Sequence, residues 1–277
     1  MLTVKPQQNY TTITDRAGSP AIWSHFPIDE IVRDPWRGVF HIDDFTRGPR
    51  TFDASGGAVT GSWLDWEIYA YTGATLADAD IDGGGIVIAS DGDNEGLAFG
   101  PGLADFRIVS TGYGKLCFEV RLKTSTIADT KHGIFAGLLE SEAIAAAVPI
   151  ATDGTIADKN CIGFWRREGD GDQFDFIYKA DGQTMQAPLT DMISGGLAAD
   201  TWVKLGFVFD PDENTANRIK VFINNIKQTT YVTGTNIDAA TFPDDINLGM
   251  AFAVMNATGS TPGNTTFDWI ACAQLKT

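Results

Sequence analysis

The acidic side chains of this sequence lack the spacing that a glycoside hydrolase with two catalytic carboxylates requires. A retaining glycoside hydrolase needs an acid and a nucleophile on one face, with carboxyl groups about 5 to 5.5 Å apart. The nearest candidate is Asp175, in the stretch Asp172-Gln173-Phe174-Asp175, but residue 177 is Ile, so no second carboxylate follows on the same face. In an extended chain Asp175 points away from Phe174 and Phe176, which indicates the solvated outer face of a sheet.

The other residue types that support catalysis are equally isolated. His25, His41 and His132 are lone residues without the H-x-x-x-H or H-E-x-x-H spacing of a zinc site. The sequence has no G-x-S-x-G elbow and no P-loop lysine motif, and no helix is expected after Gly83-Gly84-Gly85 to complete a phosphate cradle. We therefore expect no catalytic residues, no metal site of this kind and no enzymatic activity.

One turn has the composition of a calcium loop. Asp91, Asp93 and Glu95 alternate within a turn, and alternate oxygen ligands can converge on Ca²⁺. The distal bidentate Glu of an EF-hand is missing, because Gly102 occupies position twelve. Residues 170–172 and 210–214 are weaker versions of the same pattern. The sequence predicts no cofactor, with calcium at residues 91–95 as the alternative.

Sugar binding requires exposed aromatic side chains beside hydrogen-bonding groups. Trp165 and Tyr178 are the candidates. Trp165 alternates with Gly163, however, and it could instead cover that glycine on a packed outer face. Both interpretations stay open at this stage.

Charge and composition exclude several classes of partner. The 277 residues carry 20 Lys and Arg against 36 Asp and Glu, a net charge of -16, which repels nucleic acid and anionic membranes. No segment approaches about 18 consecutive apolar residues, and the first residues contain no signal-peptide core, so we expect neither a membrane span nor Sec export. Cys117, Cys161 and Cys272 are too widely spaced for a zinc site or a disulfide framework. We interpret them as reduced packing residues, with a Cys117–Cys272 bridge as the alternative if their strands pair.

Residues 1–50 are predicted to form an extended arm. Five of the eleven prolines fall in this segment, and proline removes the backbone donor that a helix or central strand needs. Large aromatic side chains in the same segment would be costly to leave in water, so they should dock on the chain's own domain or on a neighbour. These predicted interaction residues are Trp23, Phe26, Trp36, Phe40 and Phe45.

Residues 51–277 are predicted to form one all-β domain. Leu116, Phe118, Val120 and Leu122 alternate with polar residues, the pattern of a strand with one buried and one wet face. Asn224-Asn225 tolerate the positive φ of a two-residue hairpin between two further strands. Only Glu140–Val148 has a helical pattern, which Pro149 would end. The predicted strands are Trp63–Tyr69, Gly85–Ala89, Phe106–Val109, Lys115–Lys123, Gly133–Leu139, Cys161–Arg167, Gln173–Lys179, Thr201–Asp210, Arg218–Asn224, Asn247–Asn256 and Thr265–Leu275. The predicted core residues are Leu116, Phe118, Val120, Leu205, Phe207, Val221, Phe252 and Trp269.

Four of these segments carry a family resemblance. The order KLCFEVRLK, W-x-K-L-x-F at Trp202–Phe207, RIKVFINN at Arg218–Asn225 and FDWIACAQL at Phe267–Leu275 resembles the concanavalin A-like jelly roll, which includes laminin-G-like domains. The resemblance covers roughly residues 110–277 and implies two stacked antiparallel sheets. The family includes lectins, glucanases and virion-surface proteins of tailed phages, and this acidic chain with its proline-rich arm is most similar to the last group.

The resemblance implies a non-enzymatic structural protein of a virion, a capsid decoration (cement) protein of a tailed bacteriophage. Its expected partner is the major capsid protein or another virion protein, contacted through the arm. The expected assembly is a trimer on the capsid surface, formed in the host cytoplasm. A carbohydrate-binding lectin-like module that recognises a host-surface glycan is the first alternative, and a glycoside hydrolase of the glucanase type is the second.

Overall fold

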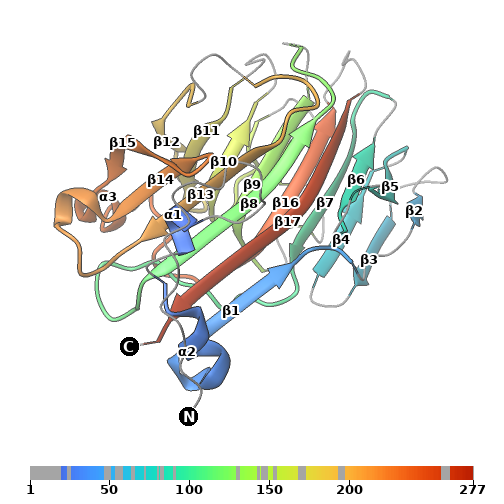
Figure 1. Cartoon of the computed structure of the whole chain (residues 1–277). Coiled ribbons are helices and arrows are strands. Elements are labelled where there is room, and N and C mark those ends of the chain that lie inside the picture. Colours follow the sequence, from blue (N-terminus) through green and yellow to red (C-terminus); the bar gives the residue numbers. More distant parts are fainter. Residues whose placement is uncertain are drawn as a thin grey trace.

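The protein folds as a sandwich of two antiparallel sheets (Figure 1). The computed structural model describes residues 20–23, 26–46, 51–53, 59–63, 66–71, 73–79, 81, 84–89, 92–128, 132–141, 144, 149–151, 155–167, 173–192, 197–256 and 263–276. The all-β prediction is confirmed, because the only helices in these ranges are short. They are α1 (Pro20–Trp23), α2 (Ile28–Arg33), η1 (Pro35–Arg37), η2 (Thr215–Asn217) and α3 (Gly234–Ile237). None of them has the length and apolar character that crossing a membrane requires.

The first sheet has β8 and β17 at its centre. Its order is β15-β14-β13-β8-β17-β6-β5-β2, and β1 also pairs with β17. On the side away from β8, β17 therefore pairs with two strands. Its residues Asn264–Phe267 pair with β6, and its residues Ile270–Leu275 pair with β1. The strands are β1 (Gly38–Asp43), β2 (Thr51–Asp53), β5 (Thr75–Asp78), β6 (Ile86–Ala89), β8 (Leu116–Thr124), β13 (Val203–Phe209), β14 (Ile219–Ile223), β15 (Ile226–Val232) and β17 (Asn264–Leu275).

The second sheet has β9 and β16 at its centre and stacks on the first (Figure 1). Its order is β12-β11-β10-β9-β16-β7-β4-β3. The strands are β3 (Val59–Trp63), β4 (Trp66–Ala70), β7 (Glu95–Pro101), β9 (His132–Glu140), β10 (Cys161–Arg166), β11 (Asp175–Lys179), β12 (Gln186–Leu189) and β16 (Leu248–Asn256).

Alternation along the strands builds the core between the sheets. Leu116, Phe118 and Val120 of β8 are fully buried, and Phe118 stacks on Phe207 of β13 with ring centroids 5.3 Å apart. Seven of the eight predicted core residues are fully buried. Trp269 is the exception, because the pairing of β17 with β8 shifts between Phe267 and Trp269 and leaves the indole half-buried on the outer face. The prediction for Trp269 is wrong for this reason.

Turns and irregular pairing account for the other differences from the predicted elements. The Asn224-Asn225 hairpin is confirmed, with φ of 48° and 69°. The predicted strand Trp63–Tyr69 is instead the end of β3 and most of β4, which pair with each other as a hairpin. Residues 106–109 are not a strand, since Phe106 makes only an isolated bridge with Leu248. Most of the predicted helix 140–148 lies outside the described residues, and Glu140 itself belongs to β9.

Candidate functional site

Residues 20–23 and 26–31 pack across the outer face of the first sheet. Ile22 and Phe26 are buried against Cys117 and Phe222, and α1 lies over β8 and β13 (Figure 1). The indole Nε1 of Trp23 donates a hydrogen bond of 2.8 Å to a Glu119 carboxylate oxygen. The alternation predicted that the whole outer face of β8 is exposed to solvent. The structure differs, because part of this face is covered. Glu119 and Cys117 are each only 1% exposed because the segment covers them.

Close contact with α1 depends on a glycine in β13. A Cβ atom on Gly206 would lie 2.3 Å from Cδ1 of Ile22 and 2.7 Å from the Phe118 carbonyl oxygen. Gly206 therefore allows the helix to approach the sheet directly. Apolar burial of Ile22 and Phe26 at about 25 cal/mol per Å² supplies the stabilisation of this contact.

The rest of the segment joins the sandwich itself. Residues 38–43 form β1, and Phe45 is 2% exposed in the main core, with its ring centroid 5.5 Å from that of Phe252. Phe40 of β1 packs edge-on against Trp23. The predicted boundary at residue 50 therefore does not separate an arm from the domain, because a strand of the first sheet precedes it. Four of the five predicted interaction residues are buried or half-buried against their own chain, and only Trp36, over whose ring Lys276 lies, presents most of its side chain to solvent.

Several exposed apolar side chains lie on or near β1. Among the described residues, seven large hydrophobic side chains are exposed, and four of them lie on or near this strand. Trp36 in η1 is 83% exposed and Val32 in α2 is 67% exposed, while Ile42 on β1 and Leu103 after β7 are 59% and 48% exposed. We call these four residues the β1 surface. Apart from Trp36, they escaped the sequence analysis because isolated Val, Ile and Leu residues carry no signal of exposure.

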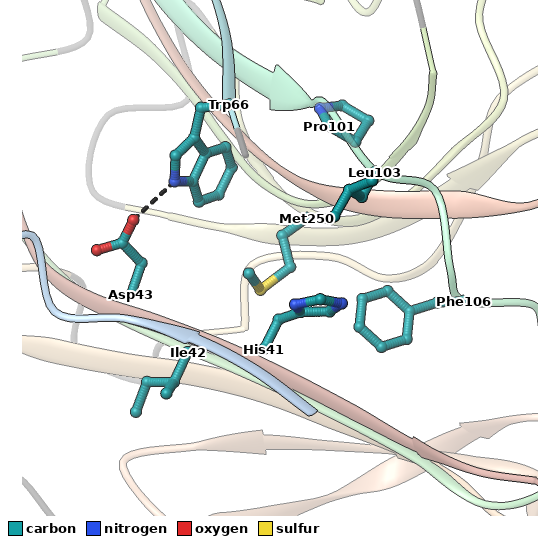
Figure 2. Close-up of a pocket in the computed structure, with 8 residues that line it drawn as sticks. All are labelled: His41, Ile42, Asp43, Trp66, Pro101, Leu103, Phe106 and Met250. Carbon is teal, nitrogen blue, oxygen red and sulfur yellow. Dashed lines mark hydrogen bonds between the residues drawn. The ribbon is translucent and has the colours of Figure 1, made fainter. Parts of the chain in front are cut away.

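A pocket opens beside the β1 surface. It has a volume of about 70 Å³ and lies between β1, β4, β16 and the segment after β7. In Figure 2, His41 and Asp43 of β1 point toward the same space as Trp66 and Met250, whereas Ile42 projects from the other face of the strand. Trp66 is 4% exposed and Phe106 is 1% exposed, so the depth of the pocket is apolar, while Leu103 forms its exposed rim.

Hydrogen bonds fix the polar groups of the pocket. The Trp66 indole Nε1 donates to Oδ2 of Asp43 at 2.7 Å, and the Phe45 amide donates to Oδ1 of the same carboxylate at 2.7 Å. Nε2 of His41 lies 3.1 Å from Oδ2 of Asp105, and the His41 ring meets Phe106 edge-on with centroids 5.6 Å apart. The pocket thus combines apolar walls with one lining carboxylate, that of Asp43, while Asp105 contacts His41. Sequence reasoning noted His41 only as a lone histidine, since Asp105 is distant in the chain.

A second polar cluster is sealed inside the sandwich. Nδ1 of His132 lies 2.6 Å from Oδ1 of Asn256, and Nε2 lies 2.8 Å from Oγ1 of Thr265, so the ring connects the two sheets. Burial lowers the pKa of His132 to about 4, with the nearby Arg166 acting in the same direction and the Asn256 hydrogen bond opposing them. A fully buried imidazole cannot meet a substrate, and we assign it a structural role.

The predicted sugar-binding aromatic residues are not exposed. Trp165 is 5% exposed and packs in the apolar layer on the outer face of the second sheet, with Ile144 and Ile150. Tyr178 is 3% exposed in the main core, and burial raises the pKa of its hydroxyl. Neither ring can stack on a sugar in this arrangement, which corrects the sequence interpretation. Asp175 is 6% exposed rather than solvated, because it lies opposite Trp165 on the same covered face.

Two other tryptophans are half-buried on the outer face of the first sheet, beyond α1. Arg121 of β8 lies over the Trp202 ring at 4.2 Å from its centroid, and Lys123 lies 5.1 Å from the same centroid. Trp269 lies beside Arg121 on the neighbouring strand, and the Arg121 guanidinium also bonds to the Asp268 carboxylate. Aromatic rings and hydrogen-bonding groups therefore meet at a position that the sequence analysis did not select.

The acidic turn is held by its own backbone. The Gly92 amide donates to Oε2 of Glu95 at 2.8 Å, which gives this carboxylate a structural role. Asp91, like His25 and residues 168–172, lies outside the described residues. In the described part of the chain no three His, Cys, Asp or Glu side chains lie close enough to hold a metal ion.

The cysteines are buried thiols. All three are free and at most 1% exposed. Cys117 pairs in register with Ala273, and Cys272 pairs with Phe118, so the two thiols do not face each other across β8 and β17. Burial raises the pKa of Cys161 to about 12 and raises those of the other two as well.

Comparison with known proteins identifies the fold. No protein-family model matches the sequence, and no curated protein matches it. Among solved structures, a protein of unknown function from Shewanella oneidensis MR-1, SO2946, is similar with 17% identity and a TM-score of 0.53, over 87% of each chain. Arcelin-5, a lectin-like defence protein from Phaseolus vulgaris, has 8% identity and a TM-score of 0.53, over 86% of this chain and 98% of its own.

A carbohydrate recognition domain gives the same result. The domain of Emp47p shares 11% identity at a TM-score of 0.51, over 83% of this chain and 96% of its own. At these identities the similarity shows the fold alone, the concanavalin A-like sandwich. The predicted fold class is confirmed.

Proposed function

We propose that the protein is a non-enzymatic structural component of a virion, a capsid decoration protein of a tailed bacteriophage. It attaches to the major capsid protein through the β1 surface, and copies assemble as trimers on the capsid. The observation that carries the proposal is the 83% exposure of Trp36 within a group of exposed apolar side chains. Exposed apolar groups of this kind mark protein interaction sites, and tryptophan is enriched among the residues that dominate binding energy.

The energetics of Trp36 support an anchoring role. A tryptophan presents roughly 200 Å² of surface, so burying the exposed part at about 25 cal/mol per Å² contributes about 4 kcal/mol. Val32 and Ile42, which are also exposed, add smaller contributions where the partner covers them. Three copies bound together gain avidity without new contacts. The anchor proposed here is a surface of the folded domain, because α1 and β1 are already packed on the first sheet.

The non-enzymatic part of the proposal is supported by the environment of Asp175. This residue was the best sequence candidate for a catalytic carboxylate. Its Oδ1 accepts a hydrogen bond of 3.1 Å from the Asp191 amide, and it lies beside Trp165 under the apolar layer on the second sheet. A buried carboxylate that accepts a backbone hydrogen bond is better suited to stabilising the fold than to exchanging a proton with a substrate.

The proposal is tested with capsids purified without the protein. Wild-type protein is expected to co-sediment with them, and Trp36→Ala should reduce the apparent affinity at least tenfold. Ile226→Ala is the matched control, because Ile226 is 69% exposed but lies on β15, the far edge strand of the first sheet. Unchanged occupancy with Trp36→Ala would show that the β1 surface is not the anchor. Deleting residues 2–49 is unsuitable, since it removes β1.

Carbohydrate binding is the second candidate, and the environment of Trp202 favours it. A half-buried indole beside Arg121 and Lys123 offers a stacking surface together with hydrogen-bond donors, as the sequence analysis required of a sugar site. A glycan array is the direct test. Binding that Trp202→Ala abolishes and Trp36→Ala preserves would favour the lectin function over the capsid function.

A further inference from the structure

Basic side chains surround Trp202 on the outer face of the first sheet. Lys204 of β13 and Trp269 of β17 both lie directly opposite Arg121, because β8 runs between these two strands (Figure 1). Lys123 follows two residues later on the same face of β8, and its ammonium lies 5.1 Å from the centroid of the Trp202 ring. We call these five residues the Trp202 patch.

The charge of the Trp202 patch is opposite to that of the molecule as a whole. The chain has 20 basic and 36 acidic residues, yet three basic side chains meet here. Like charges directly opposite each other on neighbouring strands are unfavourable, and Lys204 and Arg121 form such a pair. Burial lowers the pKa of Lys204, Glu119 opposes this effect, and Arg121 adds to it. A bound anion would relieve the repulsion.

Two carboxylates near the patch are already engaged. Glu119 is 1% exposed and accepts a hydrogen bond from the Trp23 indole, so it is closed off from solvent. Asp268 binds Arg121, but a guanidinium has five N–H donors and keeps some of them for a further acceptor. In the described part of the chain no carboxylate pairs with the Lys123 ammonium. The patch therefore retains donors for an anion from outside.

The two indoles supply an apolar surface beside these donors. Trp202 and Trp269 are half-buried, so each presents part of its ring system to solvent. The Arg121 guanidinium lies 4.2 Å from the centroid of the Trp202 ring, which places it within reach of a ligand that contacts the indole. Sugar sites combine an aromatic surface with polar groups that bind the sugar oxygens. A carboxylate adds two oxygens that match the geometry of a guanidinium.

The net charge of the protein limits how much negative charge the ligand can carry. A value of -16 repels a phosphate backbone along its length. At physiological ionic strength, charges more than about 8 Å apart are largely screened, so an isolated carboxylate interacts mainly with the cations of the patch. A sugar with one carboxylate fits this situation better than a nucleic acid does.

We propose that the Trp202 patch binds a sugar residue that carries a carboxylate. The inference rests on the carbohydrate-binding function proposed above, and it names the class of ligand. The sugar ring packs on the Trp202 indole, and its carboxylate accepts from the Arg121 guanidinium and the Lys123 ammonium. Charge-assisted hydrogen bonds are about twice as strong as neutral ones, so an acidic sugar binds more tightly than a neutral sugar of the same shape.

A titration with matched sugars tests the charge. Methyl β-glucuronide, its uncharged methyl ester and the methyl glycoside of N-acetylneuraminic acid are each added to ¹⁵N-labelled full-length protein. The Trp202 indole signal, assigned with Trp202→Phe, is followed. We expect saturable shifts in the millimolar range with at least one of the two acids, and the acid that binds more tightly identifies the source of the carboxylate. The methyl ester should bind at least tenfold more weakly than the glucuronide.

Several results of this titration would overturn the proposal. No shift with either acid would exclude the ligand class. Equal or tighter binding of the methyl ester would exclude recognition of the carboxylate. Equal binding of acetate would show that the patch takes an anion without the sugar, and tighter binding of a short single-stranded oligonucleotide would assign it to nucleic acid instead.

Matched lysine variants separate the patch from general electrostatics. Lys123→Gln should weaken binding of the acidic sugar at least fivefold. Lys227→Gln should leave it unchanged, because the Lys227 ammonium lies over the Tyr231 ring, 5.7 Å from its centroid, on the edge strand β15. The two variants remove the same charge from similar lysine–aromatic pairs of one sheet. Equal effects on binding would contradict the assignment.

The glycan array distinguishes this inference from the function on which it rests. If neutral glycans bind through Trp202 and acidic ones bind no better, the carbohydrate function stands and the inference fails. If no glycan binds, both fail. Capsid attachment through Trp36 is measured in a separate assay and depends on neither result.

Discussion

We expect acid to destabilise the protein through His132. The folded-state pKa of this imidazole is lowered from 6.5 to about 4 by burial. Between these two values the unfolded chain binds a proton that the folded chain excludes. The stabilisation is therefore fully present above the unfolded pKa of about 6.5 and is lost as the pH falls toward 4.

The size of the effect follows from the difference between the two pKa values. One pKa unit corresponds to about 1.4 kcal/mol, so the full shift of about 2.5 units is worth about 3 kcal/mol. At pH 4.5 the unfolded state is almost fully protonated at this site and the folded state only partly so. The loss between pH 7 and pH 4.5 is then about 2.5 kcal/mol.

Urea denaturation followed by tryptophan fluorescence measures this loss. His132→Gln lowers stability at neutral pH because the contacts with Asn256 and Thr265 change, but the decrease between pH 7 and pH 4.5 should shrink by about 2.5 kcal/mol relative to wild type. Phe207→Ala, which lowers stability without removing a titratable group, is the control and should keep the wild-type slope. An unchanged slope in His132→Gln would refute the assignment to this imidazole.

Three further outcomes are expected. Phe207→Ala should lower the free energy of unfolding by about 3 to 5 kcal/mol, and Trp269→Ala by clearly less, because only the first ring is fully buried; equal losses in urea titrations would contradict this placement. Ile22→Ala should cost about 2 to 4 kcal/mol in the same assay if α1 is packed as described, and a neutral result would mean that the contact contributes little. A disulfide-exchange reagent should leave the buried native thiols Cys117, Cys161 and Cys272 unmodified, and Ile22→Asp should make Cys117 alone reactive, since α1 covers it.

Short sequence patterns correctly predicted those strands and turns whose conformation depends on neighbouring residues in the chain. The alternation in residues 115–123 specified β8 because side chains of a strand face opposite sides, and Asn224-Asn225 specified a hairpin because both adopt positive φ. Trp269 was misplaced because a register shift moves side chains to the other face, and no residue type marks that shift.

The covering of the sheets could not be derived from alternation. Glu119, Trp165 and Asp175 look identical to outward-facing residues in sequence, yet other segments of the chain cover all three. Likewise, the pocket joins His41 and Asp43 of β1 to Trp66 of β4 and Met250 of β16. Its chemistry appears only when the topology brings them together.

The position of β17 has a consequence for synthesis. This strand is the last of the sandwich to leave the ribosome, yet it lies at the centre of the first sheet, between β8 on one side and β1 and β6 on the other. At roughly 5 to 20 residues per second, β8 waits on the order of ten seconds for its neighbour, with an unpaired edge and an apolar face. During that interval the negative charge of the chain should slow its association with other copies. A chain truncated before residue 264 leaves three strands, β1, β6 and β8, without their shared partner, and we expect it to aggregate.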